Sequence, residues 1–193
     1  PMKDHAVRPE PEYLIDIKKL PGLNQLEYSE EEGLKIGALT TLRMIEHSDL
    51  VKKVNPAVAA AAKSIASTQI RAKGTMVGNI CNASPSCDSG PIILASDARI
   101  LYHGLEGDRE YKASEFFKGV KKTVLESGDI VTGIIFPPLK KNQKAVYIKH
   151  AVRKAMDLAI VGVAVVITVE NGICTDSRIA LGAVAATPIR APK

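Results

Sequence analysis

The chain has 193 residues, and its 26 lysines and arginines outnumber its 21 aspartates and glutamates, which gives a net charge of 26 − 21 = +5. Apolar residues make up 46% of the chain, which excludes the low-hydrophobicity class of disordered proteins, and no apolar run approaches the roughly 18 residues of a membrane span. The scattered lysines favour a solvated surface over a nucleic-acid site, with attraction of an anionic small ligand as the weaker alternative.

The sequence of residues 13–36 predicts a strand and a hairpin. Residues 13–17 are mostly apolar and end at a turn that begins with Pro21, which indicates a short strand. Residues 26–28 and 34–36 flank an acidic run and a glycine, which indicates a weak hairpin.

Two helices are predicted next. Thr40 or Thr41 is a suitable N-cap for the first helix. Pro56 fits the first turn of the second, which is alanine-rich and covers residues 57–66. Its small side chains predict close packing against neighbouring elements.

Residues 67–91 predict a long irregular loop, because glycine, asparagine, serine, cysteine and proline crowd together there. A short helix over residues 90–96, a strand near 98–103 and a helix capped by Ser114 are expected to follow. Residues 130–136 are apolar and β-branched, which indicates a buried strand.

A proline pair before residue 139 indicates a domain boundary, and we expect domains over residues 1–139 and 140–193. The sequence of the second domain predicts three antiparallel strands, and an Asn-Gly turn at residue 171 joins two of them. Such a sheet needs a cover for its apolar face, and the remaining residues offer none. We therefore expect this domain to be incomplete.

The long irregular loop holds the residues best suited to bind a ligand. Gly74 and Gly78 permit positive φ and a close approach of backbone N–H groups to an anion. The Thr75 hydroxyl and the Asn79 amide suit a pyrophosphate, and Asp88 would accept hydrogen bonds from ribose hydroxyls or a ring N–H. A structural Ω-loop has the same composition, so the residues alone leave both interpretations open.

Residues 75–79, 82–85 and 88–91 resemble the second flavin loop of a known family. It comprises the FAD-binding (medium) subunits of molybdenum hydroxylases of the xanthine dehydrogenase and aerobic carbon monoxide dehydrogenase type. The resemblance continues in order along nearly the whole chain. Further similar segments are residues 14–17, 21–23, 36–41, 147–149, 153–157 and 181–184.

The resemblance implies an α+β fold. An FAD-binding domain of the PCMH (vanillyl-alcohol-oxidase-like) type, with two α/β subdomains, would precede the antiparallel sheet of a carbon monoxide dehydrogenase flavoprotein C-terminal-like domain. It implies an oxidoreductase subunit whose FAD takes electrons from iron–sulfur clusters and passes them to NAD or another acceptor. The molybdenum cofactor and the 2Fe–2S clusters would belong to a large and a small partner subunit. No residue of this chain is given a catalytic or metal-binding role.

Residue roles toward FAD also follow from the resemblance. Thr75, Gly78 and Asn79 would hold the pyrophosphate through hydroxyl, backbone and amide donors, with Met76 and Val77 in the same loop. The family usually has two glycines where this chain has Val77 and Gly78, and a β-branched valine does not easily take positive φ.

The remaining roles concern the adenosine half and the flavin ring. The resemblance places Asp88 at the adenosine half, and Ile65, Ala66, Ile130, Val131 and Lys149 around the flavin. A cation near the ring would favour the reduced, anionic flavin. The alternative for Lys149 is an ordinary surface lysine on a strand.

The family's opening strand with its glycine-rich phosphate loop is not found in the sequence, nor are the closing helices of its C-terminal domain. We therefore expect a chain truncated at both ends, in which half of the phosphate donors would be lost. A non-catalytic fragment or scaffold that docks onto partner subunits without flavin is the alternative function. A free-standing flavin reductase, like those acting on cell-wall sugar nucleotides, is a weaker one.

The three cysteines, Cys81, Cys87 and Cys174, are too few for a disulfide framework and too widely spaced for a zinc or iron–sulfur site. Free thiols in a reducing compartment are expected, so we expect a cytoplasmic protein. The first residues are charged and proline-rich and show no secretory signal.

Overall fold

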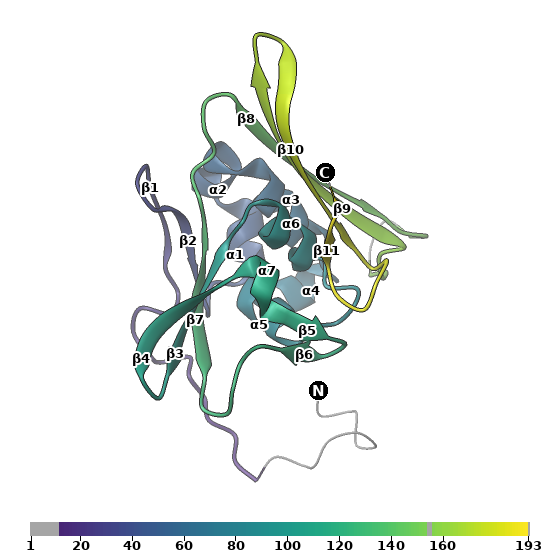
Figure 1. Ribbon diagram of the computed structural model, residues 1–193. Coiled ribbons are helices and arrows are strands. Elements are labelled where there is room, and N and C mark those ends of the chain that lie inside the picture. The colour runs from purple at the N-terminus through teal and green to yellow at the C-terminus, as the bar shows by residue number, and fades with distance from the viewer. Residues whose placement is uncertain (1–11, 154–155, 193) are drawn as a thin grey trace.

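A computed structural model describes residues 12–153 and 156–192 (Figure 1). The start of the first expected domain and two residues of the 153–157 motif lie outside the described residues. The helices are α1 (Leu42–His47), α2 (Asp49–Val54), α3 (Pro56–Ser64), α4 (Thr68–Arg71), α5 (Met76–Cys81), α6 (Ser89–Ala95) and α7 (Ala113–Phe116). The strands are β1 (Leu26–Ser29), β2 (Gly33–Gly37), β3 (Arg99–Gly104), β4 (Gly107–Lys112), β5 (Phe117–Gly119), β6 (Lys122–Thr123), β7 (Ile130–Phe136), β8 (Gln143–His150), β9 (Val161–Glu170), β10 (Ile173–Gly182) and β11 (Ile189–Arg190).

The first sheet has five antiparallel strands in the order β1-β2-β7-β3-β4. Its central strand is β7, where Ile134, Ile135 and Phe136 are all buried although they alternate between the two faces. The predicted buried strand is therefore confirmed, as is the β1–β2 hairpin, in which Leu26 pairs with Ile36.

Helices α1, α2, α3 and α6 lie between this sheet and a second one, with the sheets on opposite sides (Figure 1). Thr41 is the N-cap of α1, since its hydroxyl accepts a hydrogen bond from the Met44 amide at 3.2 Å. Pro56 opens α3, as predicted, and alanines fill most of the buried positions of that helix. Helix α3 ends at Ser64, so Ile65 and Ala66 fall in the turn that follows it.

The second sheet has four strands in the order β11-β10-β9-β8. The prediction of three strands with no cover is wrong, because β11 adds a strand and helices α3 and α6 pack against one face. A Cβ at Gly182 would lie 2.7 Å from Pro91 Cγ, so glycine permits this close contact with α6. The buried residues of both sheets form one hydrophobic cluster, which includes Tyr147 and Ala164 of the second sheet.

The predicted strand at residues 13–17 is wrong. The structure has no strand there, and Tyr13, Leu14 and Ile15 are 83%, 77% and 85% exposed. Local composition favours an extended chain, but a strand also needs a neighbour, and none of the described strands pairs with this segment.

The predicted long loop at residues 67–91 is also wrong in part. Helices α4 and α5 interrupt it, and both are only one or two turns long. Each begins after a residue whose hydroxyl accepts a backbone hydrogen bond, Ser67 for α4 and Thr75 for α5. Helix α6 matches its prediction, but α7 begins at Ala113 after Lys112, so Ser114 is not its cap.

Candidate functional site

Lys149 lies at the centre of a buried polar cluster that joins strand β8 to the helices. Its ammonium nitrogen lies 2.8 Å from Asp88 Oδ2, 3.2 Å from the Ser64 carbonyl oxygen and 2.9 Å from the Asp157 carbonyl oxygen. These three acceptors match the three hydrogens of an ammonium group. The side chains of Lys149 and Asp88 are only 11% and 10% exposed, so Lys149 is not the surface lysine of the alternative interpretation.

Tyr147 completes this cluster. Its hydroxyl donates to Asp88 Oδ1 at 3.2 Å, and residues 147 and 149 share one face of β8. Burial raises the pKa of Asp88 above its ordinary value, while the hydrogen bond and charge of Lys149 and the hydrogen bond of Tyr147 act in the opposite direction. Burial and the nearby Asp88 carboxylate also raise the pKa of Tyr147, so its hydroxyl stays a donor.

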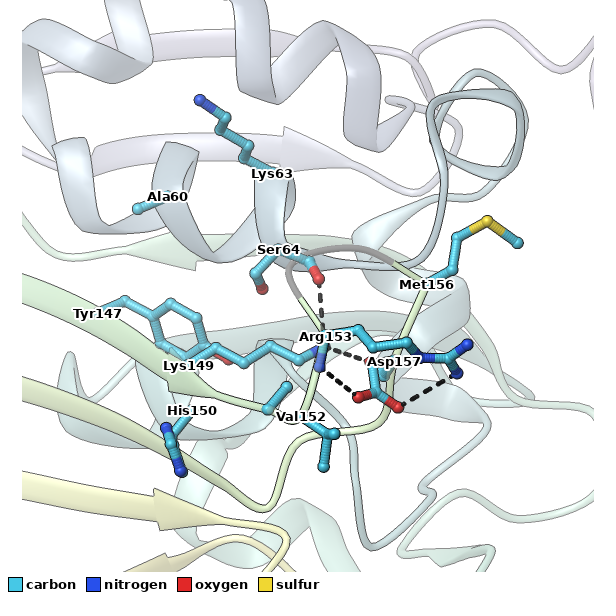
Figure 2. A pocket seen from close by; sticks show the side chains of 11 residues that line it. Ala60, Lys63, Ser64, Tyr147, Lys149, His150, Val152, Arg153, Met156 and Asp157 are labelled. Atoms are coloured by element: carbon cyan, nitrogen blue, oxygen red, sulfur yellow. Dashed lines mark hydrogen bonds and ion pairs between the residues drawn. The ribbon is translucent and has the colours of Figure 1, made fainter.

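A cavity of about 620 Å³ lies beside this cluster, between α3 and the segment that follows β8 (Figure 2). Most of the ionisable side chains around it are basic, and the Arg153 side chain pairs with the Asp157 carboxylate at 3.6 Å. This lining suits an anionic ligand. The lining residues are Ala60, Lys63, Ser64, Tyr147, Lys149, His150, Ala151, Val152, Arg153, Met156 and Asp157.

Helix α5 holds the residues predicted to bind pyrophosphate. The Thr75 hydroxyl accepts a hydrogen bond from the Gly78 amide at 2.9 Å, which caps the helix and occupies the backbone donor predicted at Gly78. Neither Gly74 nor Gly78 has a positive φ. Val77 is a buried helical residue, so the valine causes no backbone strain at this position. Met76 is likewise buried.

Asn79 links α5 to the start of α6. Its Oδ1 accepts from Cys87 Sγ at 3.1 Å and from the Ser89 amide at 3.3 Å. This fixes the orientation of the side-chain amide, and its NH₂ group has no hydrogen bond to a described residue. Ser89 follows Asp88, so Asn79 and the Lys149 cluster are connected through adjacent residues.

The turn at Ile65 and Ala66 is held by Arg71, which was not among the site residues predicted from the sequence. Arg71 Nη1 donates to the carbonyl oxygens of Ile65 at 2.9 Å and of Ala66 at 3.2 Å, and its Nε pairs with Glu46 at 2.9 Å. Glu46 and Arg71 are 25 residues apart, so no local pattern could have indicated the pair. Tyr147 was also not selected, although its spacing from Lys149 was a usable signal.

The structure does not bring Ile130 and Val131 into this group. Ile130 is 46% exposed at the start of β7, and Val131 is buried in the core beside Tyr102 of β3. Neither residue lines the cavity next to Lys149. Their predicted place along the flavin stays a prediction.

Asp88 is likewise tied to protein partners, since each of its carboxylate oxygens accepts a hydrogen bond from the Lys149 cluster. A carboxylate oxygen can accept a second hydrogen bond, so a contact with adenosine also stays a prediction. Across the described residues, no group of histidines, cysteines and acidic residues is arranged to hold a metal ion. None of the described helices is long and apolar enough to cross a membrane.

Comparison with known proteins identifies the family. Residues 2–139 match the model for the FAD binding domain in molybdopterin dehydrogenase, and residues 146–193 match the carbon monoxide dehydrogenase flavoprotein C-terminal domain. The chain is 36% identical to the xanthine dehydrogenase FAD-binding subunit of Escherichia coli O157:H7 over 92% of this chain and 61% of that protein. It is 38% identical to the glyceraldehyde dehydrogenase medium chain of Sulfolobus acidocaldarius, over 94% of this chain and 63% of that protein.

The solved structures agree with the sequence comparisons. A chain of the Hydrogenophaga pseudoflava carbon monoxide dehydrogenase that lacks the Mo-pyranopterin moiety superposes with a TM-score of 0.89 and 33% identity. The match covers 94% of this chain and 63% of that one. The chain thus spans less than two thirds of the length of these relatives. The α+β fold predicted from the resemblance is confirmed, and the chain belongs to the family of FAD-binding domains of molybdopterin dehydrogenases.

Proposed function

We propose that this chain is the FAD-binding part of a molybdenum hydroxylase and relays electrons through FAD to NAD or another acceptor. The large molybdopterin-binding subunit and the small 2Fe–2S subunit are its proposed partners, and the electrons would come from the iron–sulfur clusters. The observation that carries the proposal is the buried cation of Lys149 beside a basic cavity, in a chain of this family. The comparisons do not favour the alternative of a scaffold without flavin.

The residues present fit parts of an FAD molecule. A cavity of about 620 Å³ is within the range of about 300–1,000 Å³ that is usual for ligand sites, so a flavin-sized ring system is compatible with it. A Cβ at Gly78 would meet only the Thr75 hydroxyl within 4 Å, so the surface of α5 is open there to a close approach. The amide NH₂ of Asn79 adds a donor for an anionic phosphate.

We assign the roles accordingly. Thr75, Gly78 and Asn79 would face the pyrophosphate. Gly78 would let the phosphate approach the helix closely, but it would not donate its N–H, because that N–H already caps the helix through Thr75. Lys149 would act on the ring only through its charge, since all three of its hydrogens have protein acceptors, and the Asp88 carboxylate at 2.8 Å offsets part of that charge.

Two apolar residues complete the proposed site. Ile65 and Ala66 directly follow Ser64, which lines the cavity, and on that ground we place them at its border. When bound, FAD supplies the electron-transfer chemistry, and the protein supplies binding and orientation. We further propose the division into domains at residues 139 and 140, supported by the two family matches on either side of it.

The proposed pyrophosphate contact is tested by Asn79→Ala. Loss of a buried polar contact should weaken FAD binding about 5- to 150-fold, measured by titration with flavin fluorescence. The matched control is Asn142→Ala, because Asn142 makes an exposed hydrogen bond to Glu170 on the sheet, and this variant should bind FAD like the wild type. Equal affinity of Asn79→Ala and the control would mean that α5 does not hold the pyrophosphate.

A further inference from the structure

Arg71 is the most extensively hydrogen-bonded side chain outside the Lys149 cluster that bears on the proposed site. From the last residue of α4 it reaches the Ile65 and Ala66 carbonyl oxygens, the Thr68 hydroxyl at 3.4 Å and the Glu46 carboxylate of α1. The side chains of Arg71 and Glu46 are only 11% and 12% exposed. Each charge therefore depends on the other for its stability in the protein interior.

The turn that Arg71 contacts has an unfavourable backbone conformation. Ala66 has φ = +47°, in the left-handed region that residues with a Cβ rarely adopt. The carbonyl groups of Ile65 and Ala66 lie beyond the last residue of α3, so the helix gives them no backbone donor. The guanidinium gives both carbonyl oxygens a donor from one planar group, and this offsets the cost of the conformation.

The same side chain lies between the two segments proposed to contact FAD. The chain runs from the Ile65–Ala66 turn through α4 to Gly74, whose amide donates to the Ile70 carbonyl at 2.7 Å. The Gly74 carbonyl then accepts from the Leu42 amide at 2.9 Å, which anchors the start of α5 to α1. Glu46 is on α1 as well, so α1 supports both segments.

We propose that Arg71, held by Glu46, is a positioning residue that presets the Ile65–Ala66 turn and the start of α5 for FAD. This inference rests on the proposed function. Because the Arg71 guanidinium already donates to two carbonyl oxygens, a hydroxyl and a carboxylate, we assign it no contact with the cofactor. A guanidinium is needed because one planar fork must meet two carbonyl oxygens and a carboxylate together.

The test compares Arg71→Met, Arg71→Lys and Glu46→Gln with the wild type in the purified protein. Titration with FAD gives the affinity, and the visible circular dichroism of the bound flavin reports the geometry of its site. We expect Arg71→Met to weaken FAD binding roughly 10- to 100-fold and to change the visible spectrum, with Arg71→Lys failing to restore either. Glu46→Gln keeps the shape of the pair and should weaken binding by a smaller factor.

A matched control separates positioning from general stability. Arg190 likewise bonds a backbone carbonyl, that of Leu94, and a carboxylate, that of Asp97, but at the junction of α6 and β11. Arg190→Met should lower the stability of the apoprotein and leave FAD affinity within about twofold of the wild type. If Arg71→Met does the same, or Arg71→Lys restores affinity and spectrum fully, the inference is overturned and the proposed function stands. A wild-type protein that binds no FAD overturns the proposed function and this inference with it.

Discussion

Replacing Lys149 by methionine tests the account of the buried cluster most sharply. The substitution removes the positive charge but keeps an apolar side chain of similar length. It leaves the Asp88 carboxylate, 10% exposed, with Tyr147 as its remaining side-chain partner. It also leaves the carbonyl oxygens of Ser64 and Asp157 without the donor they now share.

The magnitude follows from the burial of the pair. Breaking a buried ion pair by removing one partner costs about 3–5 kcal/mol in the free energy of unfolding. For a chain of this size that corresponds to a decrease in Tm of about 6–20 °C. Lys63→Met is the matched control, because Lys63 lines the same cavity but is exposed, and its effect should stay within about 0.5 kcal/mol.

The effect of Lys149→Met should depend on pH. Burial already raises the pKa of Asp88, and the loss of Lys149 removes the main influence that lowers it, so this pKa rises further. The folded variant then takes up a proton more readily than the unfolded chain, whose aspartate titrates near its ordinary pKa. The deficit relative to the wild type should therefore be largest at pH 8 and should shrink as the pH falls toward 5.

Urea denaturation followed by far-ultraviolet circular dichroism at pH 8 and pH 5 measures both effects. The double variant with Asp88→Asn removes both charges, so it should recover to within about 1–2 kcal/mol of the wild type and lose the pH dependence. A deficit below about 1 kcal/mol that is equal at both pH values would show that Lys149 and Asp88 do not form a buried ion pair, because that is the behaviour of an exposed one.

Two further predictions concern packing and thiol reactivity. Gly182→Ala should destabilise the protein by about 1–3 kcal/mol in urea denaturation, because its Cβ would lie 2.7 Å from Pro91 Cγ. The control is Gly119→Ala, whose Cβ would have its nearest neighbour at 3.9 Å. Equal effects of the two substitutions would contradict the close contact between α6 and β10. Burial raises the pKa of Cys81 to about 11 and of Cys87 to about 12. At pH 8 a thiol reagent should therefore label the exposed Cys174 first and the other two cysteines only after unfolding, as counted by mass spectrometry. Rapid labelling of Cys87 in the folded protein would show that its thiol is accessible to solvent.

Local signals in the sequence were sufficient to predict helix caps and tight turns, because these depend on residues that are close along the chain. Thr41 caps its helix as expected, and the turn at Asn171 and Gly172 has positive φ at both residues, which is what an Asn-Gly hairpin requires. The strand at residues 13–17 failed because pairing depends on a neighbouring strand, which its own residues do not specify. The short helix α5 was missed because it contains a glycine and an asparagine, which are typical of loops, and α4 was missed because its four residues are too few to show a helical pattern.

The candidate site was predicted in its residue types but not in its pairings. The resemblance selected Asp88 and Lys149 for opposite ends of FAD, and the structure joins them in one ion pair across 61 residues of sequence. The Arg71–Glu46 pair was not foreseen for the same reason, since contacts between distant residues are decided by the fold. Family motifs identified the loop, whereas the contacts that Arg71 and Glu46 make around it depend on the folded structure.

A titration of the purified protein with FAD shows whether this chain binds the cofactor. We expect one FAD per chain to be retained through gel filtration, with the visible absorbance of a bound flavin, and to be released on denaturation. A colourless protein that gains no visible absorbance after incubation with excess FAD would contradict the account.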